Sequence, residues 1–200
     1  MRRRDSSRPA GLRDQRGLTA VELMVTIAIL AILIGLAAPS MSRFIVQWRL
    51  ANAVNALTGS LRIARTEAIA RARPVVVCQL APGAAAACET AAGDKDLAAG
   101  WIVFVKNDRD PKSADSLSEG DELLLRQDAL PGIAKITLNA ARFVFLPNGL
   151  TNSGATGIKF DAFGFETAST TPWARRTLCI SKPGRIRHAA DGVDCSGKKE

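Results

Sequence analysis

The first long apolar segment of the chain runs from Leu18 to Ala38 and contains one charged residue, Glu22. Its 21 residues are enough to cross a bilayer as one helix, at a rise of about 1.5 Å per residue. A lone carboxylate near the start of such a helix costs about 2.5–3.5 kcal/mol in hydrocarbon. We therefore expect a membrane-spanning helix whose glutamate needs a partner. An amino terminus newly made by cleavage after Gly17 would lie close by.

Apolar residues continue beyond this segment at steps of three and four. They are Val46, Leu50, Ala53, Val54, Leu57, Leu61, Ala64 and Ala68. Polar residues such as Arg49, Arg62 and Arg65 occupy the other faces. This spacing predicts an amphipathic helix with a globular domain packed on one side. The sequence thus predicts one helix from about Leu18 to Ala72, ended by Pro74, because proline disfavours helical geometry in the residue before it.

Beyond Pro74 the pattern changes to short β-like runs separated by turn residues. The predicted strands are Pro74–Leu80, Trp101–Lys106, Glu122–Gln127, Ile133–Leu138, Arg142–Leu146, Gly157–Phe163 and Arg176–Ile180. The alanine-rich segment Ala81–Gly100 and the charged segment Asn107–Asp121 are predicted to be surface loops. Because no long helix is expected after residue 73, the sequence predicts an α+β fold, with antiparallel sheet packed on the single helix.

The formal net charge of +8 is concentrated at the two ends of the chain. Residues 1–17 carry six arginines against two aspartates, residues 18–172 carry 14 basic and 14 acidic side chains, and residues 173–200 carry seven basic and three acidic ones. Positive charge before a membrane helix keeps the amino end cytoplasmic, so the following domain is expected to face the periplasm. Without its first 17 residues, the chain has all its excess charge in the last 28.

The four cysteines fall into two local pairs, Cys78 with Cys88 and Cys179 with Cys195. A periplasmic domain lies in a compartment that permits disulfides. Four cysteines allow three connectivities, of which the local pairing is the simplest, and buried free thiols are the alternative. The spacing lacks the C-x-x-C units of a structural zinc site, and His188 is the only histidine. We therefore predict disulfides and no metal site.

Candidate catalytic chemistry is sparse. With one histidine, the sequence offers no Ser/His/Asp or Cys/His combination, so neither an enzyme nor a cofactor is predicted. Asn107, Asp108 and Asp110 offer oxygen atoms that could hold calcium. Their segment lacks the glycine and the closing glutamate of an EF-hand loop, so a solvated turn is the favoured interpretation.

The amino-terminal signals together resemble the type III signal of type IV pilins and pseudopilins. A basic leader ends in Gly17, Leu18 replaces the usual phenylalanine, and Glu22 and Pro39 fall at positions 5 and 22 after the glycine. The resemblance implies that a prepilin peptidase cleaves the Gly17–Leu18 bond at the cytoplasmic membrane face and methylates the amine of Leu18. It also implies that Glu22 and Pro39 serve assembly, with Glu22 paired to the terminal amine of a neighbouring subunit. The alternative is an ordinary signal anchor.

The layout of one helix followed by strands, with Cys78 near the first strand and Gly-Trp-Ile-Val-Phe-Val at 100–105, resembles the GspH/FimT family of minor pilins. This implies a cleaved leader at 1–17, a transmembrane and filament-core helix at 18–39, and a periplasmic head at 40–200 that ends in the basic segment 173–200. The implied location is the bacterial inner membrane and, after assembly, the pilus at the cell surface. The implied partners are major and minor pilins and the inner-membrane assembly platform.

A second candidate site lies in the basic segment. Arg185 and Arg187 are two residues apart, so in an extended chain they share a face about 7 Å apart, with Ile186 directed oppositely. Guanidinium groups present a planar fork of donors to phosphate oxygens, and such contacts give binding that is independent of sequence. The patch could be enlarged by Lys182, Arg175 and Arg176.

The tetrapeptide Gly184-Arg185-Ile186-Arg187 resembles the Gly-Arg-x-Arg motif of FimT-type pilins that bind DNA during natural transformation. The resemblance implies double-stranded DNA as a partner, with Arg185 and Arg187 as principal contacts and Lys182 and Gly184 in support. The alternatives are a solvated basic tail or a patch that docks on acidic neighbouring subunits. For the whole protein, the alternatives are a type II secretion pseudopilin without DNA binding and a minor pilin that primes assembly. Trp173 is the one candidate for base stacking, and a packed role at a strand end is favoured.

Overall fold

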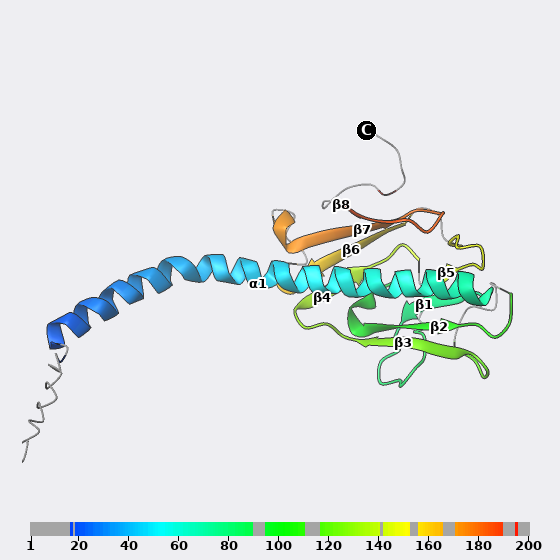
Figure 1. Ribbon diagram of the computed structural model, residues 1–200, viewed down its shortest axis with the longest axis horizontal. Helices are drawn as coiled ribbons and strands as arrows, with labels where there is room; N and C mark the ends of the chain where they lie inside the picture. The colour runs from blue at the N-terminus through cyan, green and yellow to red at the C-terminus, as the bar shows by residue number, and fades with distance from the viewer. Residues whose placement is uncertain are drawn as a thin grey trace, which may run out of the picture. The chain divides into compact units, whose positions relative to one another are not determined.

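The computed structural model describes residue 17, residues 19–89, 95–110, 117–140, 142–152, 156–165 and 171–189, and residue 195. The chain divides into two compact units, Met1–Met41 and Ser42–Glu200. Helix α1 (Ala20–Arg71) contributes to both units, and all the strands belong to the second (Figure 1). Leu18, the expected first residue after cleavage, lies outside the described residues.

The first unit contains the apolar part of α1. The hydroxyl oxygen of Thr19 accepts a hydrogen bond from the backbone N–H of Glu22 (3.2 Å), which satisfies one of the free donors in the first turn. The segment Ala20–Ala37 is long and apolar enough to cross a membrane, with a mean hydropathy of 2.6 over 18 residues. Its large apolar side chains are exposed, as lipid or neighbouring helices would require. The helix includes Pro39 without interruption.

The end of α1 is closed by backbone hydrogen bonds. Ala72 has a positive φ of 50°, and its N–H donates to the carbonyl of Ile69. The N–H of Arg73 reaches back to the carbonyl of Ala68. These two bonds form a Schellman motif, with alanine where glycine is usual. The predicted stop before Pro74 is therefore confirmed to within a residue or two.

The second unit contains two four-stranded antiparallel sheets (Figure 1). The first has the order β3-β2-β1-β5 and the second the order β4-β6-β7-β8. The strands are β1 (Val75–Gln79), β2 (Gly100–Val105), β3 (Glu122–Asp128), β4 (Ile133–Thr137), β5 (Arg142–Phe145), β6 (Thr156–Ala162), β7 (Arg175–Ile180) and β8 (Ile186–Ala189). Short 3₁₀ helices, η1 (Leu97–Ala99) and η3 (Pro172–Ala174), precede β2 and β7.

The main core lies between α1 and the inner faces of both sheets. The apolar stripe predicted on the helix is buried, with Leu50, Leu57 and Leu61 at 0 % exposure. The indole N–H of Trp101 donates to the hydroxyl of Ser60 on α1 (2.9 Å), so the one polar atom of this buried ring has a partner. A smaller cluster covers the other face of the first sheet, which explains why β1 and β2 are buried throughout rather than alternating.

All seven predicted strands and the α+β class are confirmed. The sequence predicted an extended chain at β8 but no strand, and it predicted neither of the 3₁₀ helices η1 and η3. Two of the four residues of β8, Arg187 and His188, are polar, and the strand forms because its backbone pairs with β7. Such pairing leaves no hydrophobic periodicity in the sequence.

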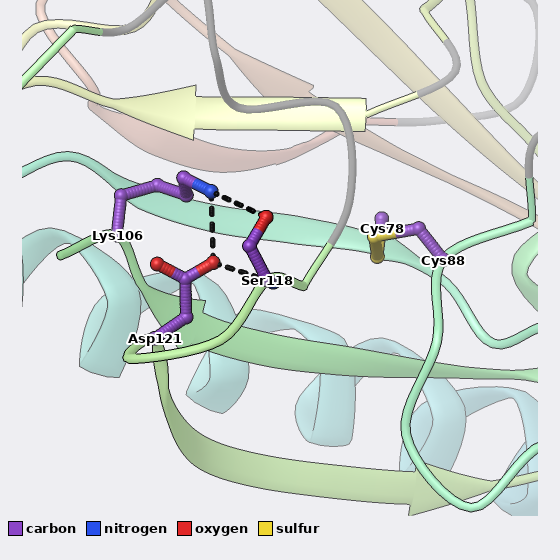
Figure 2. The surroundings of a disulfide bond; sticks show 5 residues. All are labelled: Cys78, Cys88, Lys106, Ser118 and Asp121. Atoms are coloured by element: carbon purple, nitrogen blue, oxygen red, sulfur yellow. Dashed lines mark hydrogen bonds and ion pairs between the residues drawn. A yellow bond between two sulfur atoms is a disulfide. The ribbon is translucent and has the colours of Figure 1, made fainter. Parts of the chain in front are cut away.

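Both local disulfides are present. Cys78 in β1 bonds to Cys88 in the following loop, with the Cα atoms 5.6 Å apart (Figure 2). Cys179 in β7 bonds to Cys195, with the Cα atoms 5.3 Å apart. Gly157 in β6 makes room for the second bridge, because a Cβ atom there would lie 3.0 Å from the sulfur of Cys195. The second disulfide therefore ties the carboxyl-terminal segment to the middle of the second sheet.

Candidate functional site

The β7–β8 hairpin carries the basic motif singled out in the sequence. Its turn is closed by hydrogen bonds from the N–H of Gly184 to the carbonyl of Ser181 (2.8 Å) and from the N–H of Ser181 to the carbonyl of Arg185 (2.9 Å). The N–H of Thr151 donates to the carbonyl of Lys182 (3.0 Å), which ties the turn to the preceding loop. The turn is therefore held by backbone bonds, and the side chains of Lys182 and Arg185 remain exposed.

Gly184 is required by its conformation and by its surroundings. Its φ is +72°, a region that other residues adopt only at a cost. A Cβ atom at this position would lie 2.7 Å from the carbonyl oxygen of Gly149 and 3.0 Å from Nε of Arg65. The glycine of the motif therefore lets the hairpin approach helix α1 closely.

Arg65 makes the contact between the helix and the hairpin. Its Nη1 atom donates a long hydrogen bond to the carbonyl of Gly184 (3.4 Å). Its Nε atom is buried and has no hydrogen-bond partner among the described residues. The guanidinium group is thus partly withdrawn from water against the turn, and one of its five N–H donors bonds to a residue in the described part of the chain.

A pocket of about 450 Å³ opens beside this contact. It is lined by Arg62, Arg65, Thr66, Gly184, Arg185 and Ile186. Three of these six residues are cationic and none is acidic. Arg62 and Arg65 are three residues apart on α1, so they lie on the same face of the helix. The pocket therefore joins helix arginines to the first arginine of the motif, an arrangement that suits an anion.

Arg187 lies elsewhere on the hairpin. It is in β8, opposite Cys179 of β7, so its side chain shares the face of the sheet that carries the Cys179–Cys195 disulfide. Arg185 precedes β8 by one residue and lines the pocket together with Ile186. The sequence-based expectation assumed an extended chain, in which Arg185 and Arg187 share one face. Because Arg185 lies in the turn before β8, its direction is set by the turn rather than by the alternation of side chains along a strand.

The sequence suggested that Arg175 and Arg176 could enlarge the basic patch formed by Lys182, Arg185 and Arg187. The structure corrects this expectation, because both residues lie outside the patch. Both are at the start of β7, at the end of the strand away from the hairpin. Nε of Arg175 forms an ion pair with Asp161 (2.9 Å), and Arg176 donates to the carbonyl of Arg175 (2.9 Å). Their charge is used within the sheet.

Trp173 packs against other side chains of the head. Its ring meets that of Phe165 edge to face, with centroids 4.9 Å apart, and the guanidinium carbon of Arg43 lies 5.6 Å from its centroid. This confirms the packed role favoured by the sequence. In the charged loop, Asp108 accepts from the N–H of Asp110 (3.1 Å), a local turn bond.

The expected processing and assembly residues lie in the first unit. Gly17 and Glu22 are exposed. Glu22 is the third residue of α1, where the positive end of the helix dipole favours a carboxylate. Within the described part of the chain, no cation pairs with this carboxylate. It is therefore available to a group from outside the subunit.

We predict that Gly184→Ala destabilises the head more than Gly83→Ala does. Both glycines have positive φ, and a Cβ atom at Gly83 meets nothing within 4 Å. Gly83→Ala should therefore cost about 1–2 kcal/mol from backbone strain alone. Gly184→Ala should cost about 1–3 kcal/mol more, because the methyl group collides with Gly149 and Arg65. Urea unfolding of the segment from Ser42 onward would measure both values. Equal losses would contradict a close approach at Gly184.

The chain was compared with protein families, solved structures and curated proteins. The family model described as type II transport protein GspH matches residues 53–185, and the model of the prokaryotic N-terminal methylation motif matches residues 12–38. The crystal structure of the type IV minor pilin FimU from Pseudomonas aeruginosa is 21% identical, covers 70% of this chain and 92% of its own, and has a TM-score of 0.48. The minor pseudopilin EpsH of the type 2 secretion system of Vibrio cholerae is 11% identical, covers 72% and 99%, and has a TM-score of 0.47. No curated protein matches the chain.

Proposed function

The chain belongs to the GspH family of minor pilins and pseudopilins, and from this premise we propose that it is a minor type IV pilin that binds extracellular DNA for uptake in natural transformation. The observation that carries the proposal is the hairpin of β7 and β8. It presents Lys182, Arg185 and Arg187 as exposed cations on a backbone held by hydrogen bonds and a disulfide. A rigid display of arginines reduces the ordering cost of binding a polyanion.

Processing and assembly come first in this proposal. The methylation motif implies a prepilin peptidase as a partner, followed by assembly with other pilins. We place the cut between Gly17 and Leu18, with methylation of the new Leu18 amine. The remaining chain would stay in the inner membrane through α1 with its head in the periplasm, and would then enter the pilus.

The expected DNA contacts are electrostatic. None of the described residues forms a hydrogen bond or an ion pair with the side chains of Lys182, Arg185 or Arg187, so all three are available to phosphates. Phosphate contacts carry no sequence information and release counterions, so binding should be independent of sequence and should weaken with salt. The hairpin from Arg175 to Ala189 contains no Phe, Tyr or Trp for stacking, so duplex DNA is the favoured form.

A second candidate function is that of a type II secretion pseudopilin, which would recruit secreted protein and bind no DNA. The description of the matching family as a type II transport protein favours it. A minor pilin that primes assembly is a third possibility. Neither alternative requires the hairpin arginines.

Gel mobility shift tests the proposal directly. The chain should begin at Leu18 and be held in neutral detergent, so that the six arginines before it do not contribute. We expect two unrelated duplexes to bind equally. The double variant Arg185→Ala, Arg187→Ala should weaken binding at least about tenfold and reduce the salt slope by about 2.

The matched control is Arg126→Ala. Arg126 is also exposed, but it lies on β3 of the other sheet and is paired with Asp128. It should bind DNA as the parent does. Equal binding by the double variant would reject Arg185 and Arg187 as the site. Absence of binding by both the chain and sheared filaments, where avidity is high, would favour the secretion or priming function.

A further inference from the structure

We infer that helix α1 supplies part of the DNA-binding surface, with Arg62 and Arg185 holding one backbone phosphate together in the pocket beside the hairpin. The inference rests on the proposed function and extends it to an element outside the basic carboxyl-terminal segment. The sequence placed Arg62 and Arg65 only on the polar side of the helix. The tertiary structure brings them next to Arg185, which is more than 100 positions away along the chain.

Arg62 and Arg185 are the two groups free to move toward a ligand. Both are exposed, and neither guanidinium group forms a hydrogen bond or an ion pair with any residue that the structure describes. Thr66 lies one turn beyond Arg62 on the same face of α1 and adds an exposed hydroxyl to the pocket wall. A phosphate bound in the pocket could accept hydrogen bonds from the forked donors of both arginines.

Arg65 forms the fixed side of the pocket and acts as a positioning residue. It is half-buried, its Nη1 atom contacts the carbonyl of Gly184, and its buried Nε atom has no partner. Its charge is therefore held in place and poorly screened by water. The glutamate nearest in sequence, Glu67, is already paired with Arg71.

The electrostatics of the pocket favour an anion. Three of the six residues that line it are cationic and none of the six is acidic, so an anion that enters would relieve the repulsion among three like charges. A carboxylate of a neighbouring subunit would relieve the same repulsion. DNA is favoured because Arg185 of the pocket lies in the same hairpin turn as the exposed Lys182, and a duplex backbone presents a series of phosphates to such neighbouring cations.

Double-mutant cycles test whether one phosphate is shared. Mobility shifts would use the chain from Leu18 in neutral detergent with a duplex of arbitrary sequence. Arg62→Gln should weaken binding about five- to tenfold. If one phosphate is shared, Arg62→Gln with Arg185→Gln should weaken binding by less than the product of the two single effects. Arg62→Gln with Arg187→Gln should give the full product, because Arg187 lies on the disulfide face of the sheet.

The control is Arg126→Gln, which removes the same charge from the other sheet and should leave binding unchanged. An unchanged thermal midpoint for Arg62→Gln would show that the head remains folded.

DNA binding unaffected by Arg62→Gln but lost with Arg185→Ala, Arg187→Ala would overturn this inference and leave the proposed function standing. Loss of filament incorporation by Arg62→Gln with DNA binding unchanged would assign the pocket to a subunit contact. Multiplicative effects of Arg62→Gln and Arg185→Gln would overturn the shared phosphate, and a parent chain that binds no DNA would overturn both proposals.

Discussion

Glu22→Ala is expected to exclude the protein from filaments while leaving membrane insertion and cleavage intact. The carboxylate lies in the exposed apolar part of α1, where an unpaired charge is costly. In a filament core, the terminal amine of a neighbouring subunit would attract it strongly and offset much of that cost. Removing the carboxylate leaves the amine without a partner. Immunoblots of sheared filaments and of the membrane fraction would measure the two outcomes.

Val21→Ala is the matched control for this experiment. Val21 is the neighbouring residue, exposed in the same turn of α1, and carries no charge. It should enter filaments at close to the parent level. Normal incorporation of Glu22→Ala would contradict a role for this carboxylate in assembly.

Asp121→Ala is expected to lower the free energy of unfolding of the head by about 3–5 kcal/mol, because it removes the carboxylate that pairs with the buried ammonium of Lys106. The Nζ atom of Lys106 lies 2.8 Å from Asp121, and the two side chains are 2 % and 1 % exposed. Lys106 also donates to the hydroxyl of Ser118 (3.3 Å) (Figure 2). Asp121 accepts two further bonds, from the backbone N–H groups of Asn107 and Ser118 (both 2.8 Å). The pair thereby closes the charged loop at both ends.

The same pair predicts a dependence of stability on pH. Burial alone raises the pKa of the Asp121 carboxyl group, but the hydrogen bonds from Lys106, Asn107 and Ser118 outweigh it and hold the pKa below its usual value. Because the folded pKa lies below the unfolded value of about 3.9, the stabilisation is fully present above that pH. It is lost as the pH falls through the folded pKa. The difference between the parent and Asp121→Ala should therefore shrink in acid.

Urea unfolding of the segment from Ser42 onward, followed by tryptophan fluorescence, to which the buried Trp101 contributes, would measure both effects. This segment contains every residue of both hydrophobic clusters. Asp128→Ala is the control, because its ion pair with Arg126 is exposed and should contribute less than about 1 kcal/mol. A loss for Asp121→Ala no larger than that of the control would show that Lys106 finds water or another partner.

Periodicity in the sequence was sufficient to predict the helix and seven of the strands, because burial against one core imposes a repeat on the side chains. The stripe from Leu50 to Ala68 is an example, since each apolar position predicted there is buried. The strand β8 had no such repeat. Its hydrogen bonds to β7 are made by the backbone, which any sequence can supply.

Some features of the candidate site could likewise be predicted from the sequence, and others depend on tertiary contacts. The motif Gly184-Arg185-Ile186-Arg187 could be recognised from four adjacent letters, and the local spacing of the cysteines indicated how they would pair. The need for glycine at position 184 could not be predicted from the motif, because it arises from the close approach of Arg65 and Gly149 in the folded chain. The separation of Arg175 from the patch likewise depends on Asp161 in the neighbouring strand.

By itself, the sequence determined the membrane segment, the methylation signal, the α+β class and the location of excess charge, because each depends on residue types close together along the chain. Only the tertiary structure decided which charges meet. It paired Lys106 with Asp121, withdrew Arg175 into the sheet and placed Arg62 and Arg65 beside Arg185. Electrostatic interactions depend on distance in space and on burial, and neither is encoded by position along the chain.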